Sequence, residues 1–253
     1  MKEFQEYENV LDIDQRAQIE EIEAFETRYG KRHTLWNNRS EFQDKKDKWY
    51  MGNFLEQEAE KIVEDVKDYQ MQNHDMKKRL KKGEKDEVLH DFTIEVQETF
   101  DHCELIKALG CKDLEDRHWK KIFTKIDSGF INMDRRDLTL KRMIDDGALD
   151  EQDYIQEVAG TAAGEAKLNL ELTEVKDRWN VLEFFVAQYR DTKDRFIIKE
   201  VEDVITQLED DIMSVSAMMG SRYVNEIRGE VEDWERKLGY LSDTIDEWLT
   251  FQR

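Results

Sequence analysis

The sequence predicts an all-α protein, an elongated stack of long antiparallel helices, from three observations. Charged residues make up 39 % of the chain, as much as the apolar residues, so a large part of the chain must face water. The 253 residues contain no proline and 11 glycines, so helices can run long without interruption. We find no strand-like alternation of useful length, whereas helical spacing of apolar residues recurs along the chain.

The clearest pattern is an apolar stripe near the C-terminus, in which spacings of three and four residues alternate. Its members are Val224, Ile227, Val231, Trp234, Leu238, Leu241, Ile245 and Trp248. This is a heptad seam, and the charged residues between its members give the helix a water-facing side. The helix must therefore pack against others, and we expect Trp234 and Trp248 to anchor it in the interior.

Two more long helices are predicted before this one. They run from about Glu151 to Arg190 and from about Lys193 to Ser216, and Met219-Gly220-Ser221 supplies the turn that follows. Together the three segments predict an antiparallel three-helix stack.

Thinner apolar stripes predict helices in the N-terminal half, with breaks at Tyr29-Gly30, Met51-Gly52 and Lys82-Gly83. The expected helices are Leu11 to Tyr29, Leu35 to Trp49, Phe54 to Leu80 and Val88 to Leu105. Residues from Asp127 to Asp137 form the expected irregular loop.

The formal net charge of −21 argues against two classes of partner. Such a field repels the phosphate backbone of nucleic acids and anionic lipid headgroups. No apolar run approaches the length of a membrane span, and the acidic first residues lack the features of a signal peptide. We therefore expect an intracellular protein with neither partner, in which Cys103 and Cys111 are reduced thiols.

No constellation of residues predicts catalysis, a bound cofactor or a metal. A phosphate-binding Gly-rich loop is missing, and Gly160 and Gly164 are read as a place where another helix approaches closely. The histidines stand singly, and His102 and Cys103 point about 100° apart on a helix, so they cannot form a nucleophile and its base. The acidic runs at 12–14 and 209–211 lack the calcium-loop pattern and are read as solvated faces. We expect this chain not to be an enzyme.

One stretch carries a specific resemblance. Residues 109–122, which include Arg117-His118-Trp119, resemble the Leu-Arg-Asn-Pro-Ala-Leu-x-x-Arg-His-Trp segment of the dynein heavy chain linker. Further matches follow in order, at 179–189, 208–211, 220–224, 227–238 and 246–253, and the last of these look most like axonemal dyneins. Gly110, Cys111 and Lys112 stand where the family has Arg-Asn-Pro, so this chain departs from the family in the loop before Arg117.

The resemblance, which covers about Trp36 to Arg253, implies a mechanical role. Residues 1–34 would be the end of the tail and 35–253 the N-terminal part of the linker, a fragment of a motor whose ATP and Mg²⁺ bind in an AAA+ ring outside this chain. The implied partners are that ring and the intermediate and light chains near the tail, in the cytoplasm and cytoskeleton of the ciliary axoneme. We expect six structural anchors: Arg117, His118, Trp119, Trp179, Trp234 and Trp248.

A spectrin-like or coiled-coil cytoskeletal scaffold is the alternative, because long helices, heptads and high charge fit it equally well. Spectrin repeats recur along the chain, and we find no second Arg-His-Trp and no second copy of the C-terminal seam.

Overall fold

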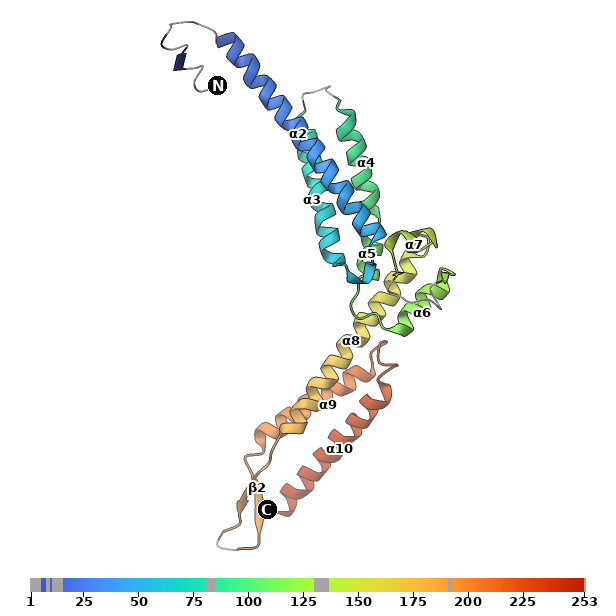
Figure 1. Cartoon of the computed structure of the whole chain (residues 1–253). Coiled ribbons are helices and arrows are strands. Elements are labelled where there is room, and N and C mark those ends of the chain that lie inside the picture. The colour runs from blue at the N-terminus through green and yellow to red at the C-terminus, as the bar shows by residue number, and fades with distance from the viewer. Residues whose placement is uncertain are drawn as a thin grey trace. The chain divides into compact units, whose positions relative to one another are not determined.

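The computed structural model describes residues 6–7, 10, 16–80, 85–129, 137–190 and 193–252, and is mostly helical, which confirms the predicted fold class (Figure 1). It divides into two compact units, one formed by residues 1–110 and 123–152 and the other by residues 111–122 and 153–253.

The first unit is built on three helices, α2 (Arg16–Met51), α3 (Ala59–Lys78) and α4 (Glu87–Asp101), of which α3 and α4 lie side by side in opposite directions (Figure 1). Phe42, Tyr69 and Phe92, one from each helix, meet edge to face, with ring centroids 5.2 to 6.2 Å apart. Edge-to-face contacts of this kind favour one arrangement of rings in a core.

Short elements complete this unit. They are the 3-10 helix η1 (Phe54–Glu56), α5 (Cys103–Leu109) and α7 (Leu140–Asp145). The Asp86 carboxylate accepts hydrogen bonds from the N–H groups of Val88 and Leu89, at 3.1 and 3.2 Å, and so caps the start of α4. Gly110 lies so close to Ala59 that a Cβ added to it would be 2.1 Å from the Ala59 Cβ. This close approach gives a packing reason for glycine at a position where the resembled family differs.

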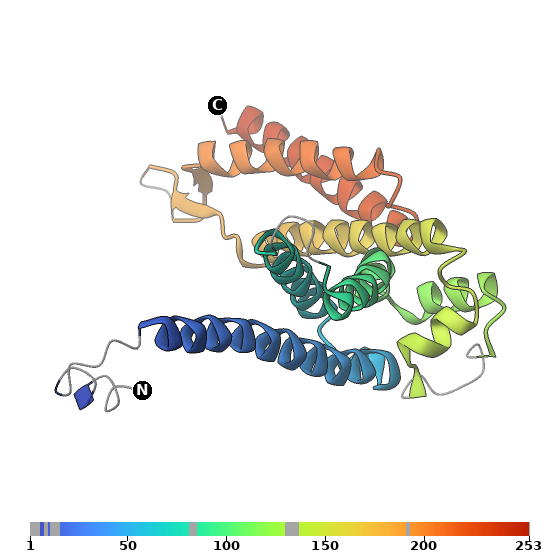
Figure 2. The ribbon, with the colours of Figure 1, turned by 90° about the horizontal axis from the view of Figure 1, so that it is seen from above.

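The second unit contains the predicted three-helix stack. Its helices are α8 (Gln152–Val181), α9 (Glu202–Met219) and α10 (Arg228–Phe251), and α9 and α10 form an antiparallel pair beside α8 (Figure 2). All three contribute to one apolar core, which includes Leu172, Val175, Leu208, Val215, Val231 and Leu238. Gly220 ends α9, so the turn expected at 219–221 is confirmed.

The prediction that α8 continues to Arg190 and that the next helix begins at Lys193 is wrong. An antiparallel hairpin of β1 (Phe185–Gln188) and β2 (Phe196–Lys199) lies between α8 and α9, with Val186 opposite Ile198. Aromatic and β-branched residues at 184–186 and 196–198 favour strands over helix. The hairpin also shows that the expectation of no strand-like alternation of useful length is wrong.

The break predicted at Tyr29-Gly30 is also wrong, because α2 runs through Gly30 without interruption. A single glycine costs a helix only about 1 kcal/mol, which the remainder of a long helix offsets. The irregular loop expected from Asp127 to Asp137 lies largely outside the described residues, since 130–136 are not described.

Candidate functional site

The Arg117-His118-Trp119 triplet opens α6 (Asp116–Lys125) and belongs to the second unit. His118 is 1 % exposed, and its Nδ1 accepts a hydrogen bond from the backbone N–H of Glu115 at 3.1 Å. A side chain in the first turn that bonds back to the N–H of the residue before the helix is one half of a capping box. His118 therefore caps the helix that contains it.

The other ring nitrogen of His118 reaches a second helix. Its Nε2 lies 3.0 Å from the Glu165 Oε2 of α8. Because Nδ1 must keep its lone pair to accept the Glu115 N–H, the ring proton is on Nε2, which donates to the Glu165 carboxylate. One buried imidazole thus fixes the start of α6 and holds it to α8.

Arg117 adds charge to the same junction. Its guanidinium donates to Glu165 Oε2 at 2.7 Å and forms an ion pair with Glu226 Oε2 at 2.5 Å. Glu226 lies between α9 and α10, so Arg117 links three parts of the second unit. Trp119, the third residue of the triplet, is 3 % exposed.

A second polar junction joins α8 to α9 within the apolar core. Asp211 is 2 % exposed and accepts hydrogen bonds from Arg178 Nη2 at 2.5 Å and from Trp179 Nε1 at 2.8 Å. The hydrogen bond to Asp211 raises the pKa of Arg178. A carboxylate of this kind supplies the partner that a partly buried indole N–H and guanidinium need.

The interpretation of residues 209–211 as a solvated acidic face is wrong for Asp211. Asp211 shares a buried face of α9 with Leu208, Val215 and Met218. The spacing of three and four residues between these positions was available in the sequence, and a carboxylate inside an apolar helical stripe is a signal of a buried pair.

The C-terminal apolar stripe, which α10 and the turn before it carry, is buried unequally along its two rows. Val224, Val231, Leu238 and Ile245, seven residues apart, are all fully buried, whereas Ile227, Trp234 and Leu241 are only partly covered by the core. Trp248 is 45 % exposed, so the expectation that it anchors the interior is wrong. Ile227, Trp234 and Leu241 pack against the core of the second unit, and Trp248, the last member of their row, is not among the residues that do so.

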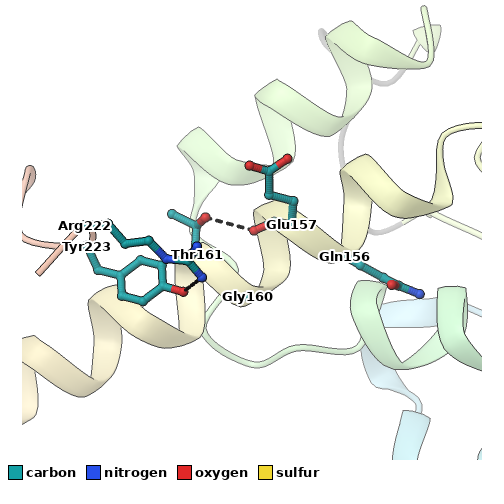
Figure 3. Close-up of a pocket in the computed structure, with 6 residues that line it drawn as sticks. All are labelled: Gln156, Glu157, Gly160, Thr161, Arg222 and Tyr223. Carbon is teal, nitrogen blue, oxygen red and sulfur yellow. Dashed lines mark hydrogen bonds between the residues drawn. The ribbon is translucent and has the colours of Figure 1, made fainter.

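A shallow cavity of about 350 Å³ lies between α8 and the segment before α10 (Figure 3). It is lined by Gln156, Glu157, Gly160, Thr161, Arg222 and Tyr223. The Glu157 carboxylate points away from Arg222, whose guanidinium instead donates to the Tyr223 hydroxyl (Figure 3).

The neighbouring Gly164 is covered by the Tyr223 ring, since a Cβ there would lie 2.5 Å from Tyr223 Cδ2. The close approach expected at Gly160 and Gly164 is therefore found at Gly164 alone, where an aromatic ring and not another helix makes it, and a Cβ at Gly160 would meet nothing within 4 Å. The cavity brings together no nucleophile and base. Within the described residues no group of histidine, cysteine and acidic side chains is placed to hold a metal ion, and no described helix is long and apolar enough to cross a membrane.

The second unit is therefore a helical module in which buried polar side chains join packed helices. The sequence of the whole chain matches a family model, that of dynein heavy chain N-terminal region 2, over residues 22–253, which includes most of both units. The chain belongs to this family. The match favours the dynein resemblance over the spectrin-like alternative.

Individual relatives agree with the family. The chain is 27 % identical to human dynein axonemal heavy chain 6 over 237 residues, 94 % of this chain and 6 % of the relative. It is 25 % identical to mouse dynein axonemal heavy chain 3 over 86 % of this chain and 5 % of the relative. It is 27 % identical to the Chlamydomonas reinhardtii dynein gamma chain of the flagellar outer arm over 58 % of this chain and 3 % of the relative. The chain thus spans a small fraction of the length of these relatives.

Proposed function

We propose that this chain is the tail-side part of the linker of an axonemal dynein heavy chain and that it transmits the ATP-driven power stroke from the motor ring to the tail. The observation that carries the proposal is the single core shared by α8, α9 and α10. Closely packed helices have low compressibility and pass a displacement on, whereas loops would absorb it.

The polar junctions support the same role. The Arg117 and His118 contacts to Glu165 tie α6 to α8, and the Asp211 contacts tie α8 to α9. Buried, directional bonds resist sliding of one helix past another more than apolar contacts do, because a shift of one turn leaves charged groups without partners. The module moves as one body under load.

The proposal assigns ATP and Mg²⁺ to an AAA+ ring of the same heavy chain, and gives this segment no cofactor of its own. Its partners are that ring and, near the tail, the intermediate and light chains, with no nucleic acid or membrane among them. Its location is the axoneme of the cilium within the cytoskeleton. Purified chain is expected to release no phosphate from ATP above the blank, and turnover that follows the protein through purification would contradict this part.

The direct test is made in a full heavy chain that carries this segment. Leu172→Ala removes a fully buried side chain of the shared core, and Leu170→Ala, on the same helix, removes one that is 61 % exposed. Leu172→Ala is expected to lower the velocity of microtubule gliding while the microtubule-stimulated ATPase is retained. The reason is that a more compliant linker transmits less displacement for each ATP hydrolysed, whereas hydrolysis itself does not depend on this core. Leu170→Ala is expected to change neither. Loss of ATPase in proportion to velocity, or normal velocity in Leu172→Ala, would contradict the proposal.

A further inference from the structure

The β1–β2 hairpin has few contacts of its own that keep it folded. In its two four-residue strands Ile198 alone is buried, whereas Phe185 is 56 % exposed, Phe196 54 % and Val186 48 %. A two-stranded hairpin is only marginally stable in water by itself. This hairpin therefore depends on its contacts with the rest of the second unit.

The backbone is also strained shortly after each strand ends. Arg190 and Glu200 have φ angles of 51° and 56°, in the left-handed region. Residues other than glycine adopt such angles only where the surrounding structure requires them. The strain gives a second reason why the hairpin needs support from outside its own ladder.

The hydrogen-bond pattern of the hairpin shows which backbone groups are open to such support. The Tyr189 N–H donates to the Arg195 carbonyl at 2.9 Å, so residues 189 and 195 form a hydrogen-bonded pair. Hydrogen-bonded and non-hydrogen-bonded pairs alternate along an antiparallel ladder, which makes Val186 and Ile198 a non-hydrogen-bonded pair. The N–H and carbonyl of Ile198 therefore point outward from β2, away from β1.

A side chain at the end of α10 occupies both of these outward groups (Figure 1). Gln252 Oε1 accepts the Ile198 N–H at 3.1 Å, and Gln252 Nε2 donates to the Ile198 carbonyl at 3.0 Å. The Gln252 amide thus makes the two bonds that a neighbouring strand would make. Gln252 is itself placed by the helix, because its backbone N–H donates to the Trp248 carbonyl at 3.0 Å.

We propose that the Gln252–Ile198 pair is a latch, and that the hairpin stays folded only while the last turn of α10 holds Gln252 against β2. A primary amide carries a donor and an acceptor side by side, so both bonds form together and are lost together. When the last turn of α10 frays, the hairpin loosens with it, and the shared core of α8, α9 and α10 stays packed. The hairpin is then a local element whose order follows the state of one helix end.

Hydrogen exchange of the whole chain, measured by NMR at single amides, is the first test. In the wild-type chain the Ile198 N–H is expected to exchange slowly, and the Val186 N–H, which points outward without an acceptor among the described residues, to exchange fast. Gln252→Met keeps the length of the side chain and makes neither bond. It is expected to bring the Ile198 N–H to the rate of Val186, and to accelerate the ladder amides of Ala187 and Ile197 roughly tenfold to a hundredfold.

Gln188→Met is the matched control, because it makes the same replacement on β1. The Gln188 side chain is exposed and forms no hydrogen bond with another described residue, so all of these rates are expected to stay as in the wild type. The Leu238 N–H, in the core of α10, is expected to keep its rate in both variants. An Ile198 N–H as fast as that of Val186 in the wild-type chain would overturn the proposal. So would a Gln252→Met variant that accelerates Ile198 and leaves the ladder amides unchanged.

A second test leaves Gln252 in place and does not depend on how well its variant folds. Coupling between two elements is reciprocal, so a broken hairpin must loosen the end of α10. Ile197→Pro removes an N–H that the ladder uses, and Val186→Pro removes one that it does not use. Exchange of the Gln252 N–H is expected to be faster in Ile197→Pro and unchanged in Val186→Pro. Equal rates in the two variants would overturn the latch.

Discussion

At the scale of single residues, His118 accounts for much of the organisation around α6. Its Nδ1 accepts a hydrogen bond from the Glu115 N–H, and its Nε2 donates one to the Glu165 carboxylate. Resemblance to the family singles out Arg117-His118-Trp119 as structural anchors but names no partner for them. Glu165 lies in the middle of α8, so the partner of both residues could not be read from the sequence.

His118→Ala is expected to lower the free energy of unfolding by about 1 to 3 kcal/mol, because the Glu115 N–H and the Glu165 carboxylate lose a partner. His118→Gln is expected to lose less, since glutamine at this position of a capping box accepts the same backbone N–H. Urea unfolding followed by circular dichroism measures both. Equal losses in the two variants would show that the cap at Glu115 contributes nothing.

Asp211 gives a second prediction at this scale. Asp211→Ala leaves the Arg178 guanidinium and the Trp179 N–H without their acceptor and is expected to cost about 1 to 3 kcal/mol in unfolding free energy. The matched control is Asp210→Ala, one residue earlier on the exposed side of α9, with an expected change within about 0.5 kcal/mol. A cost at position 210 as large as at 211 would contradict the buried junction.

At the scale of elements, periodicity predicted the helices well and the hairpin poorly. The helix expected from Phe54 to Leu80 contains α3, which begins only at Ala59 after the short helix η1, and the stripe from Val224 to Trp248 is helical from Arg228, where α10 begins. Residues 182–201 were absorbed into two long helices because an apolar run as short as Phe184-Phe185-Val186 fits either a helix or a strand. The positive φ angles of Arg190 and Glu200, 51° and 56°, reflect tertiary geometry that no spacing rule reveals.

The unequal rows of α10 lead to an element-scale prediction. Trp234 is half-buried against the core and Trp248 is exposed, so Trp234→Ala is expected to destabilise the chain more than Trp248→Ala. The cost at Trp234 is expected to fall below the roughly 3 to 5 kcal/mol of a fully buried tryptophan. Thermal or urea unfolding of the two variants side by side provides the comparison. A larger loss for Trp248→Ala would place the anchor at the opposite end of the stripe.

At the scale of the whole molecule, composition, charge and resemblance gave the fold class and the family, and the family match over residues 22–253 confirms the latter. The division into tail and linker at residue 34 stays a prediction. The ion pairs that join helices of the second unit involve residues far apart in sequence, such as Arg117 with Glu165 and Arg178 with Asp211. Long-range partners of this kind depend on helix order and crossing, which local patterns do not encode.

The central claim is that the α8–α10 unit transmits force without yielding, and stretching single molecules between Asp153 and Phe251 in an optical trap tests it most directly. These residues lie at the start of α8 and the end of α10. The expected result is a constant length up to a single abrupt rupture, at a force that falls when Leu172 is replaced by alanine. Gradual lengthening at forces lower than those a dynein motor generates would contradict the account.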